Sequence, residues 1–132
     1  MKIFILEDNL ERRNWFDAYL KGHTVTHADS CAQVNRFHPP YDVIFLDHDL
    51  GGRRFYSLED NGETFAKMIA HHVGEATVIL HSFNPVGAQN IERALLDVRL
   101  DRTDFTGPIL IAPFLGREFK NLIYHIKKGR NR

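Results

Sequence analysis

The chain has few of the sequence features that are typical of exported or membrane proteins. Cys31 is its only cysteine, so no disulfide can form within the chain. No apolar run approaches the roughly 20 residues that a membrane-spanning helix needs. The start, residues 1–7, is too short and turns acidic too soon for a signal peptide. We therefore expect a protein of the reducing cytoplasm that has no membrane partner.

Net charge is also missing. The 17 Lys and Arg residues balance the 17 Asp and Glu residues, so the chain has no general attraction to nucleic acid, and we expect no DNA-binding domain. The basic end, residues 128–132, is interpreted as a flexible solubilising tail rather than a binding arm. A length of 132 residues, 43% of them hydrophobic, fits one compact domain over residues 1–132. The oligomeric state stays open.

Short apolar runs alternate with stretches of helical periodicity. Strands are predicted at residues 2–6, 23–27, 43–46, 77–80 and 108–112, and helices at residues 9–20, 61–72, 88–98 and 118–127, with a short helix after Asp29 or Ser30 and before Pro39-Pro40. This βα alternation, with right-handed crossovers, predicts a three-layer α/β fold whose five-stranded parallel sheet has the order 2-1-3-4-5. The core residues expected are Ile3, Ile5, Val43, Phe45, Val78, Leu80, Ile109 and Ile111.

Acidic residues follow two of the predicted strands. Glu7 and Asp8 come after the first, and Asp47 and Asp49 come after the central one. Parallel strands end at the same edge of a sheet, where open α/β folds bind ligands, so these carboxylates should converge. Carboxylates that share a small space repel each other unless a cation neutralises them, which predicts a Mg²⁺ or Mn²⁺ site. Alternatively some of these acids only cap helices: Asp8 the first helix, and Asp60 or Asn61 the third.

Two histidines stand at the same edge. His48 lies within the acidic cluster, and His81 follows the fourth strand together with Ser82 and Asn84. Because these polar residues follow an apolar strand at the edge of the sheet, His81, Ser82 and Asn84 are expected to face one crevice. Imidazole titrates near neutral pH, so a histidine there can serve as an acid or a base. If the strands stay extended, Asp47 and Asp49 point one way and His48 the other, whereas a single bend past Asp47 would cancel that separation. The competing interpretation is that each histidine merely packs or caps.

The connection after the central strand, residues 51–60, is unusually long, since such loops commonly have about 2 to 6 residues. Arg53 and Arg54 stand beside two aromatic residues there. In one interpretation the arginines bind a phosphate and the aromatic rings stack on a nucleotide base. In the other, the segment is a solvated flap whose aromatic residues pack on the domain.

Several of these residues together resemble the receiver domain of two-component response regulators. The pattern consists of Glu7-Asp8, Asp47, Ser82 and Pro113-Phe114. The resemblance implies a flavodoxin-like fold, Mg²⁺ held by the acid pair and Asp47, a phosphoryl group accepted by Asp47 and sensed by Ser82, and a lysine before the Pro-Phe pair. Here that position is Ala112, so the site lacks the lysine that contacts the phosphate.

Longer motifs are similar to a divergent branch, the cyclic-phosphate-processing receiver domains. They are residues 46–51, the Asn61-Gly62 helix start and residues 81–87. This resemblance implies a cyclic phosphate as substrate, such as the 2′,3′-cyclic end of an RNA or a nucleotide.

The combined hypothesis is metal-dependent hydrolysis of a cyclic phosphate. Glu7, Asp8, Asp47 and Asp49 would hold the metal, and His48 and His81 would divide the base and acid roles, with His81 as the principal acid or base. The residues expected to bind substrate are Ser82, Asn84, Arg53 and Arg54. Alternatively Asp47 itself attacks phosphorus. The rival class is a non-enzymatic receiver-like signalling or nucleotide-binding module.

Overall fold

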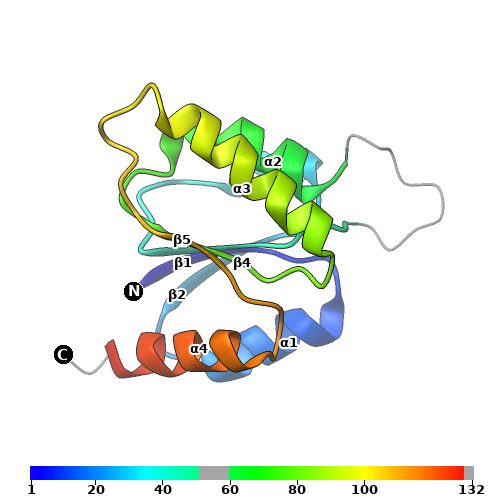
Figure 1. Cartoon of the computed structure of the whole chain (residues 1–132). Helices are drawn as coiled ribbons and strands as arrows, with labels where there is room; N and C mark the ends of the chain where they lie inside the picture. The colour runs from blue at the N-terminus through cyan, green and yellow to red at the C-terminus, as the bar shows by residue number, and fades with distance from the viewer. Residues whose placement is uncertain (51–59, 130–132) are drawn as a thin grey trace.

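The computed structural model describes residues 1–50 and 60–129, which form one parallel sheet with helices on both faces (Figure 1). The strands are β1 (Lys2–Leu6), β2 (Thr24–Ala28), β3 (Val43–Leu46), β4 (Thr77–Leu80) and β5 (Ile109–Ile111). They lie in the order β2-β1-β3-β4-β5, and every neighbouring pair is parallel. The predicted sheet order is therefore confirmed.

The helices cover the sheet in two layers. They are α1 (Leu10–Tyr19), the 3₁₀ helix η1 (Cys31–Arg36), α2 (Gly62–Ile69), the 3₁₀ turn η2 (Ala70–His72), α3 (Pro85–Arg99) and α4 (Arg117–Gly129). Figure 1 shows α1 and α4 below the sheet, with α2 and α3 above it. No helix within residues 1–50 and 60–129 is both long enough and apolar enough to cross a membrane.

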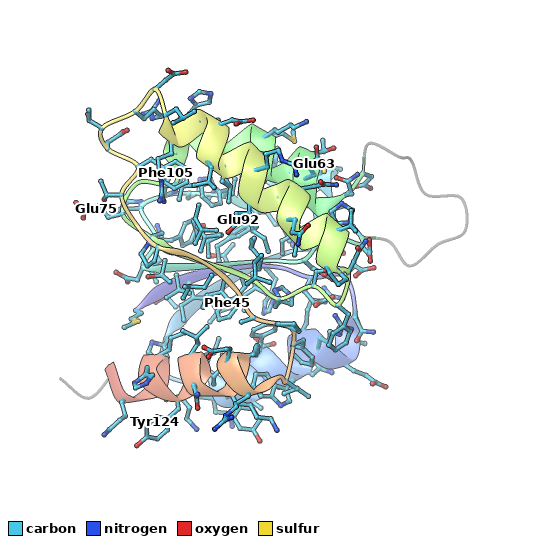
Figure 2. The ribbon with its side chains drawn as sticks, in the orientation of Figure 1. Phe45, Glu63, Glu75, Glu92, Phe105 and Tyr124 are labelled. Carbon is cyan, nitrogen blue, oxygen red and sulfur yellow. The ribbon has the colours of Figure 1, made fainter. Side chains whose placement is uncertain are left out.

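Alternation along the strands divides the core into two. Ile3, Ile5 and Phe45 pack with α1 and α4, whereas neighbours such as Phe4 and Leu46 pack with α2 and α3. Phe45 can be followed in Figure 2 on the α1–α4 side of the sheet. The residues that directly follow a strand continue the same alternation, so their position in the chain decides on which face of the sheet each candidate site residue lies.

Six of the eight predicted core residues are buried, and the two on β5 are corrections. Ile109 is only partly buried, and Ile111 is 40% exposed. The reason is that β5 is the edge strand of the sheet, with β4 as its one partner.

Asparagines cap the N-termini of α1, α2 and α3. The side-chain oxygen of Asn9 accepts the Arg12 N–H at 3.0 Å, so Asn9 rather than Asp8 caps α1. Asn61 caps α2 in the same way, whereas Asp60 accepts the Cys31 N–H. Asn84 caps α3, which begins at Pro85, three residues earlier than predicted, because proline suits the first helical position.

Two further features differ from prediction. The short second helix starts after Ser30 and ends before Pro39-Pro40, as predicted, but it is a 3₁₀ helix and the Ser30 side chain makes no capping hydrogen bond. Lys128 and Gly129 belong to α4 rather than to a tail, and residues 130–132 lie outside the described part.

Candidate active site

Strand register brings three polar side chains into one row. Leu6, Leu46 and Leu80 are partners across β1, β3 and β4. The next residues along these strands are Glu7, Asp47 and His81, and the ladder continues past the strand ends: Asp47 N–H bonds to the Leu6 carbonyl at 3.2 Å and His81 N–H to the Leu46 carbonyl at 3.1 Å. The row faces the α1–α4 layer, because each residue stands two positions after a strand residue that packs there.

Glu7 and His81 form a buried pair. Nε2 of His81 lies 3.0 Å from Oε1 of Glu7, and both side chains are fully buried. Burial alone would raise the pKa of Glu7, but the hydrogen bond and charge of His81, the Asn9 N–H and Arg12 together hold this pKa below its usual value. An ionised carboxylate only accepts hydrogen bonds, so His81 donates from Nε2.

His81 is packed as a core residue. Its ring lies 5.5 Å from the ring centre of Phe16 and 6.4 Å from that of Phe114. Its Nδ1 is buried and has no hydrogen-bond partner within residues 1–50 and 60–129. Of the three residues expected to face one crevice, Ser82 lines the pocket described below, Asn84 caps α3, and His81 does not reach the pocket surface.

The pKa of Asp47 is shifted in the opposite direction to that of Glu7. Burial, and next the charge of Glu7, raise the pKa of Asp47 to about 6, although His81, the His48 N–H and Arg12 favour its charged form. One ligand atom from each of Glu7, Asp47 and His81 lies within 4.8 Å of the others, close enough to share a cation. Burial is the main cause of this raised pKa, so the ionised form of Asp47 is disfavoured at this position.

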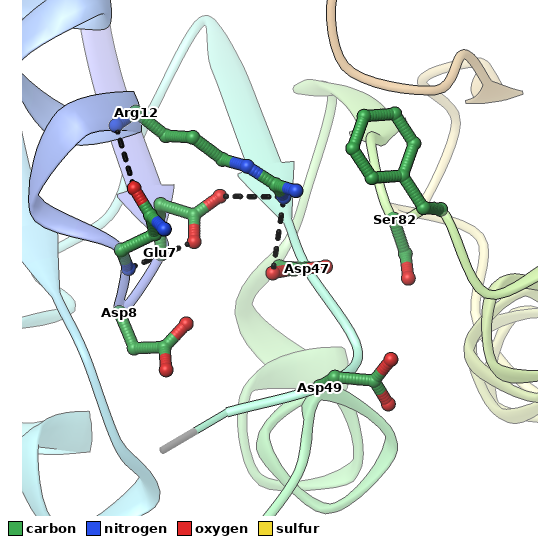
Figure 3. Close-up of a pocket in the computed structure, with 8 residues that line it drawn as sticks. Glu7, Asp8, Arg12, Asp47, Asp49 and Ser82 are labelled. Atoms are coloured by element: carbon green, nitrogen blue, oxygen red, sulfur yellow. Dashed lines mark hydrogen bonds and ion pairs between the residues drawn. The ribbon is translucent and has the colours of Figure 1, made fainter. Parts of the chain in front are cut away.

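A pocket of about 370 Å³ opens above the row. Its walls combine acidic, amide, hydroxyl and aromatic groups with one guanidinium (Figure 3). The lining residues are Glu7, Asp8, Asn9, Arg12, Asp47, Asp49, Ser82 and Phe83. The structure thus brings all four of the predicted metal-binding carboxylates to one pocket.

Arg12 is the residue that the sequence interpretation missed. Its Nη1 lies 3.5 Å from Oε1 of Glu7 and 3.8 Å from Oδ2 of Asp47, and its guanidinium stacks 4.5 Å from the centre of the Phe83 ring. Figure 3 shows the guanidinium reaching from α1 across the pocket toward Asp47. The signal available in the sequence was its position in the first turn of a helix that follows the acid pair.

His48 lies on the other face of the sheet. Its Nδ1 is 2.8 Å from Oδ1 of Asp49, whose carboxylate also accepts a hydrogen bond from Nδ2 of Asn84 at 3.3 Å. The ring packs against Gly87 in the first turn of α3, where a Cβ atom would come within 2.4 Å of His48 Cγ. His48 and His81 are therefore not brought together, but Asp49 links His48 to the pocket wall.

The Asn61-Gly62 pair has a structural explanation. Gly62 N–H donates to the His48 carbonyl at 2.7 Å. A Cβ atom on Gly62 would lie 1.9 Å from the Asp47 carbonyl oxygen, so only glycine lets α2 start this close to the site. The motif thus fixes the backbone that carries Asp47 and His48. Arg53 and Arg54, expected to bind substrate, lie outside the described residues.

The family assignment agrees with this geometry. Residues 1–97, which carry the acid pair, Asp47, His48 and His81, match the family described as cyclic-phosphate processing receiver domain. The chain belongs to this family. Its predicted fold and family resemblance are both confirmed. The comparison with curated proteins gave no match.

Solved structures support the fold. The response regulatory domain of mrkE from Klebsiella pneumoniae has 14% sequence identity and a TM-score of 0.61, with 99% of this chain and 98% of that chain covered. The BeF3-activated receiver domain of DrrB, a Thermotoga maritima response regulator, has 15% identity and a TM-score of 0.64 over 99% and 97% of the two chains. The N-terminal domain of WS1339 from Wolinella succinogenes has 20% identity and a TM-score of 0.64 over 99% and 94%. At these identities the likeness establishes a shared receiver fold.

Proposed function

We propose that the pocket hydrolyses a cyclic phosphodiester, carried by a small nucleotide or by the 2′,3′-cyclic end of an RNA, with the help of a divalent cation. The observation that carries the proposal is the pairing of the buried Asp47, which lines the pocket, with an imidazole, His48, that lies outside the pocket lining but contacts the pocket-wall residue Asp49. A site that only accepts a phosphoryl group does not need an oriented imidazole.

The residues present fit a divalent cation. Glu7 and Asp47 would be its ligands, with Asp8 and Asp49 also on the pocket wall. The donors are mostly carboxylate oxygens, which suits Mg²⁺ or Mn²⁺, and a cation beside Asp47 would favour the ionised form that burial disfavours. When bound, the cation would neutralise these carboxylates and draw negative charge from the phosphoryl oxygens.

Hydrolysis needs two proton transfers, one to a base and one from an acid. A base takes a proton from water as its oxygen bonds to phosphorus, and an acid gives a proton to the ribose oxygen as that P–O bond breaks, which leaves a phosphate monoester. We assign one of these two transfers to His48, which lies outside the described pocket lining and whose Nδ1 contacts Asp49 on the pocket wall. Ser82, on the pocket wall, and Asn84, which holds Asp49, are proposed to orient the substrate.

His81 acts through Glu7 in this proposal. With no exposed surface, its ring is separated from a substrate in the pocket, and its Nε2 is engaged by Glu7. We therefore assign it to positioning: it fixes the carboxylate that would bind the cation, as outer hydrogen bonds commonly do for metal ligands.

A second candidate is a receiver-like switch in which Asp47 accepts a phosphoryl group. In its favour, Asp47 lines the pocket within a receiver fold, and Ser82 stands opposite. Against it, residue 112 is a fully buried alanine, so the site lacks the lysine charge partner at that position.

The test is a substrate panel. The purified protein is incubated with 2′,3′-cyclic nucleotides, 3′,5′-cyclic nucleotides and an RNA with a 2′,3′-cyclic end, with Mg²⁺, with Mn²⁺ or with EDTA. Turnover should need the metal and should fall by about 10² to 10⁴ in His48→Ala, the usual cost of losing an acid or base. His125→Ala, an exposed histidine on α4, is the matched control and should keep full turnover. Equal turnover in both variants would remove His48 from the mechanism.

A further inference from the structure

The phosphoryl group of a substrate would need a cationic partner, and the position that supplies one in the receiver resemblance is Ala112, buried in the core. Among the described residues that line the pocket, Arg12 is the one with a basic side chain. Its guanidinium offers five N–H donors in a planar fork, the geometry that suits phosphate oxygens.

The contacts of Arg12 leave those donors available. The 3.5 and 3.8 Å separations from Glu7 and Asp47 are longer than ordinary N–H···O hydrogen bonds, so the guanidinium balances their charge without a close hydrogen bond to either. Phe83 and Phe114 lie 4.5 and 5.1 Å from it and support its plane. About a fifth of the side chain, 22%, is exposed.

The two carboxylates that Arg12 balances are also the two that would bind a cation. Arg12 and a divalent ion therefore compete for the same negative charge. Once an ion neutralises the carboxylates of Glu7 and Asp47, they no longer balance the charge of Arg12. The guanidinium can then bind a phosphate.

We propose that Arg12 is the phosphate-binding cation of this pocket, and that it serves as a counter-charge to Glu7 and Asp47 until a divalent ion takes over those carboxylates. Arg12 thus supplies the positive charge for the phosphate that Ala112 cannot supply, and it does so from α1 and not from the residue that follows β5. The inference rests on the proposed function for the identity of the substrate, whereas its anion site exists independently of turnover.

The test measures two affinities in Arg12→Gln, Arg12→Lys and the control Arg13→Gln, which makes the same charge change one position along α1 and away from the pocket lining. Mg²⁺ binding is measured by titration calorimetry. Binding of inorganic phosphate to the Mg²⁺-loaded protein is followed by ³¹P NMR. Unfolding curves establish that each variant is folded.

Opposite effects on the two ligands are the expected signature. Arg12→Gln should weaken phosphate binding by about 10- to 100-fold, the scale of lost hydrogen bonds to a charged group. It should bind Mg²⁺ as tightly as the parent protein or more tightly, because a competing cation has gone. Arg12→Lys should recover part of the phosphate affinity, and Arg13→Gln should match the parent in both measurements.

Two results would overturn the proposal. One is phosphate affinity in Arg12→Gln equal to that of Arg13→Gln. The other is a parallel loss of Mg²⁺ and phosphate affinity, which would make Arg12 a structural support of the carboxylates. If the parent protein binds both ligands as expected yet hydrolyses no cyclic phosphate, the proposed function fails while the role of Arg12 stands.

Discussion

Nε2 of His81 lies 3.0 Å from Oε1 of Glu7, and neither side chain reaches solvent. The pair joins the ends of β4 and β1 across β3, which carries Asp47 between them. A buried carboxylate that loses its partner keeps the full cost of desolvation, so this pair supports both the fold and the site.

We expect His81→Ala to destabilise the protein by about 3 to 5 kcal/mol, the usual cost of leaving a buried charge, here the Glu7 carboxylate, without its partner. His81→Gln, whose amide N–H can still donate to Glu7, should lose clearly less. Urea unfolding curves at pH 7 measure both. A loss below about 1 kcal/mol in His81→Ala would mean that the pair contributes little to stability.

The raised pKa of Asp47, about 6, gives a prediction with a definite sign for the metal-free protein. The unfolded chain would release this proton near pH 4 and the folded chain near pH 6. Stability from the protonated form is thus present below about pH 4 and lost as the pH rises to about 6. At pH 8 the ionised carboxylate would cost roughly 3 kcal/mol.

Asp47→Asn cannot ionise and should escape this cost. In EDTA, we expect it to be more stable than the parent protein at pH 8, with the advantage fading toward pH 4, as followed by urea unfolding at five pH values. A parent protein that is the more stable of the two at pH 8 would reverse the assignment. With Mg²⁺ added, the parent should gain stability and Asp47→Asn should gain little.

Gly87 tests the placement of His48. Alanine in place of glycine inside a helix normally stabilises it by about 1 kcal/mol. Here the new methyl would lie 2.4 Å from His48 Cγ, so Gly87→Ala should instead destabilise the protein and shift the imidazole resonances of His48 in NMR spectra. Val86→Ala, an exposed neighbour on the same turn, is the control. A stabilised Gly87→Ala variant with unshifted His48 resonances would show that the ring lies elsewhere.

Asp49 tests the orientation of that imidazole. Asp49→Asn keeps the shape of the side chain but removes the carboxylate that faces His48 Nδ1. Turnover of a cyclic phosphate should fall by about 10- to 100-fold, as is typical when the partner of a functional histidine is lost. Asp97→Asn, exposed on α3, should have no effect. A full rate in Asp49→Asn would leave the His48–Asp49 pair without a catalytic role.

The sequence was sufficient to predict the sheet order and to locate the acidic edge, because apolar runs and the polar residues after them are local features. Alternation along an extended strand allows His48 to lie opposite Asp47, but the sequence left open a bend past Asp47 that would have cancelled this separation. The same alternation places His81 on the side of Ile79, in the α1–α4 core, but the pattern does not show that the Phe16 and Phe114 rings close over it.

Arg12 escaped prediction for a different reason. A helix periodicity reports which side chains are apolar, and an arginine followed by a second arginine in the first turn of a helix reads as part of a solvated face. Its placement depends on how α1 crosses the sheet and on the Phe83 ring that follows β4. Both are tertiary relationships between segments that are distant in sequence.

We propose that this receiver fold hydrolyses a cyclic phosphate instead of accepting a phosphoryl group. The most direct measurement follows the metal-loaded protein by ³¹P NMR with 2′,3′-cyclic AMP, and in parallel by intact-protein mass spectrometry with acetyl phosphate. Conversion of the cyclic resonance to that of a monoester, stopped by EDTA and by His48→Ala, is the predicted result. An unchanged cyclic resonance, together with a phosphorylated protein that Asp47→Asn abolishes, would contradict the account.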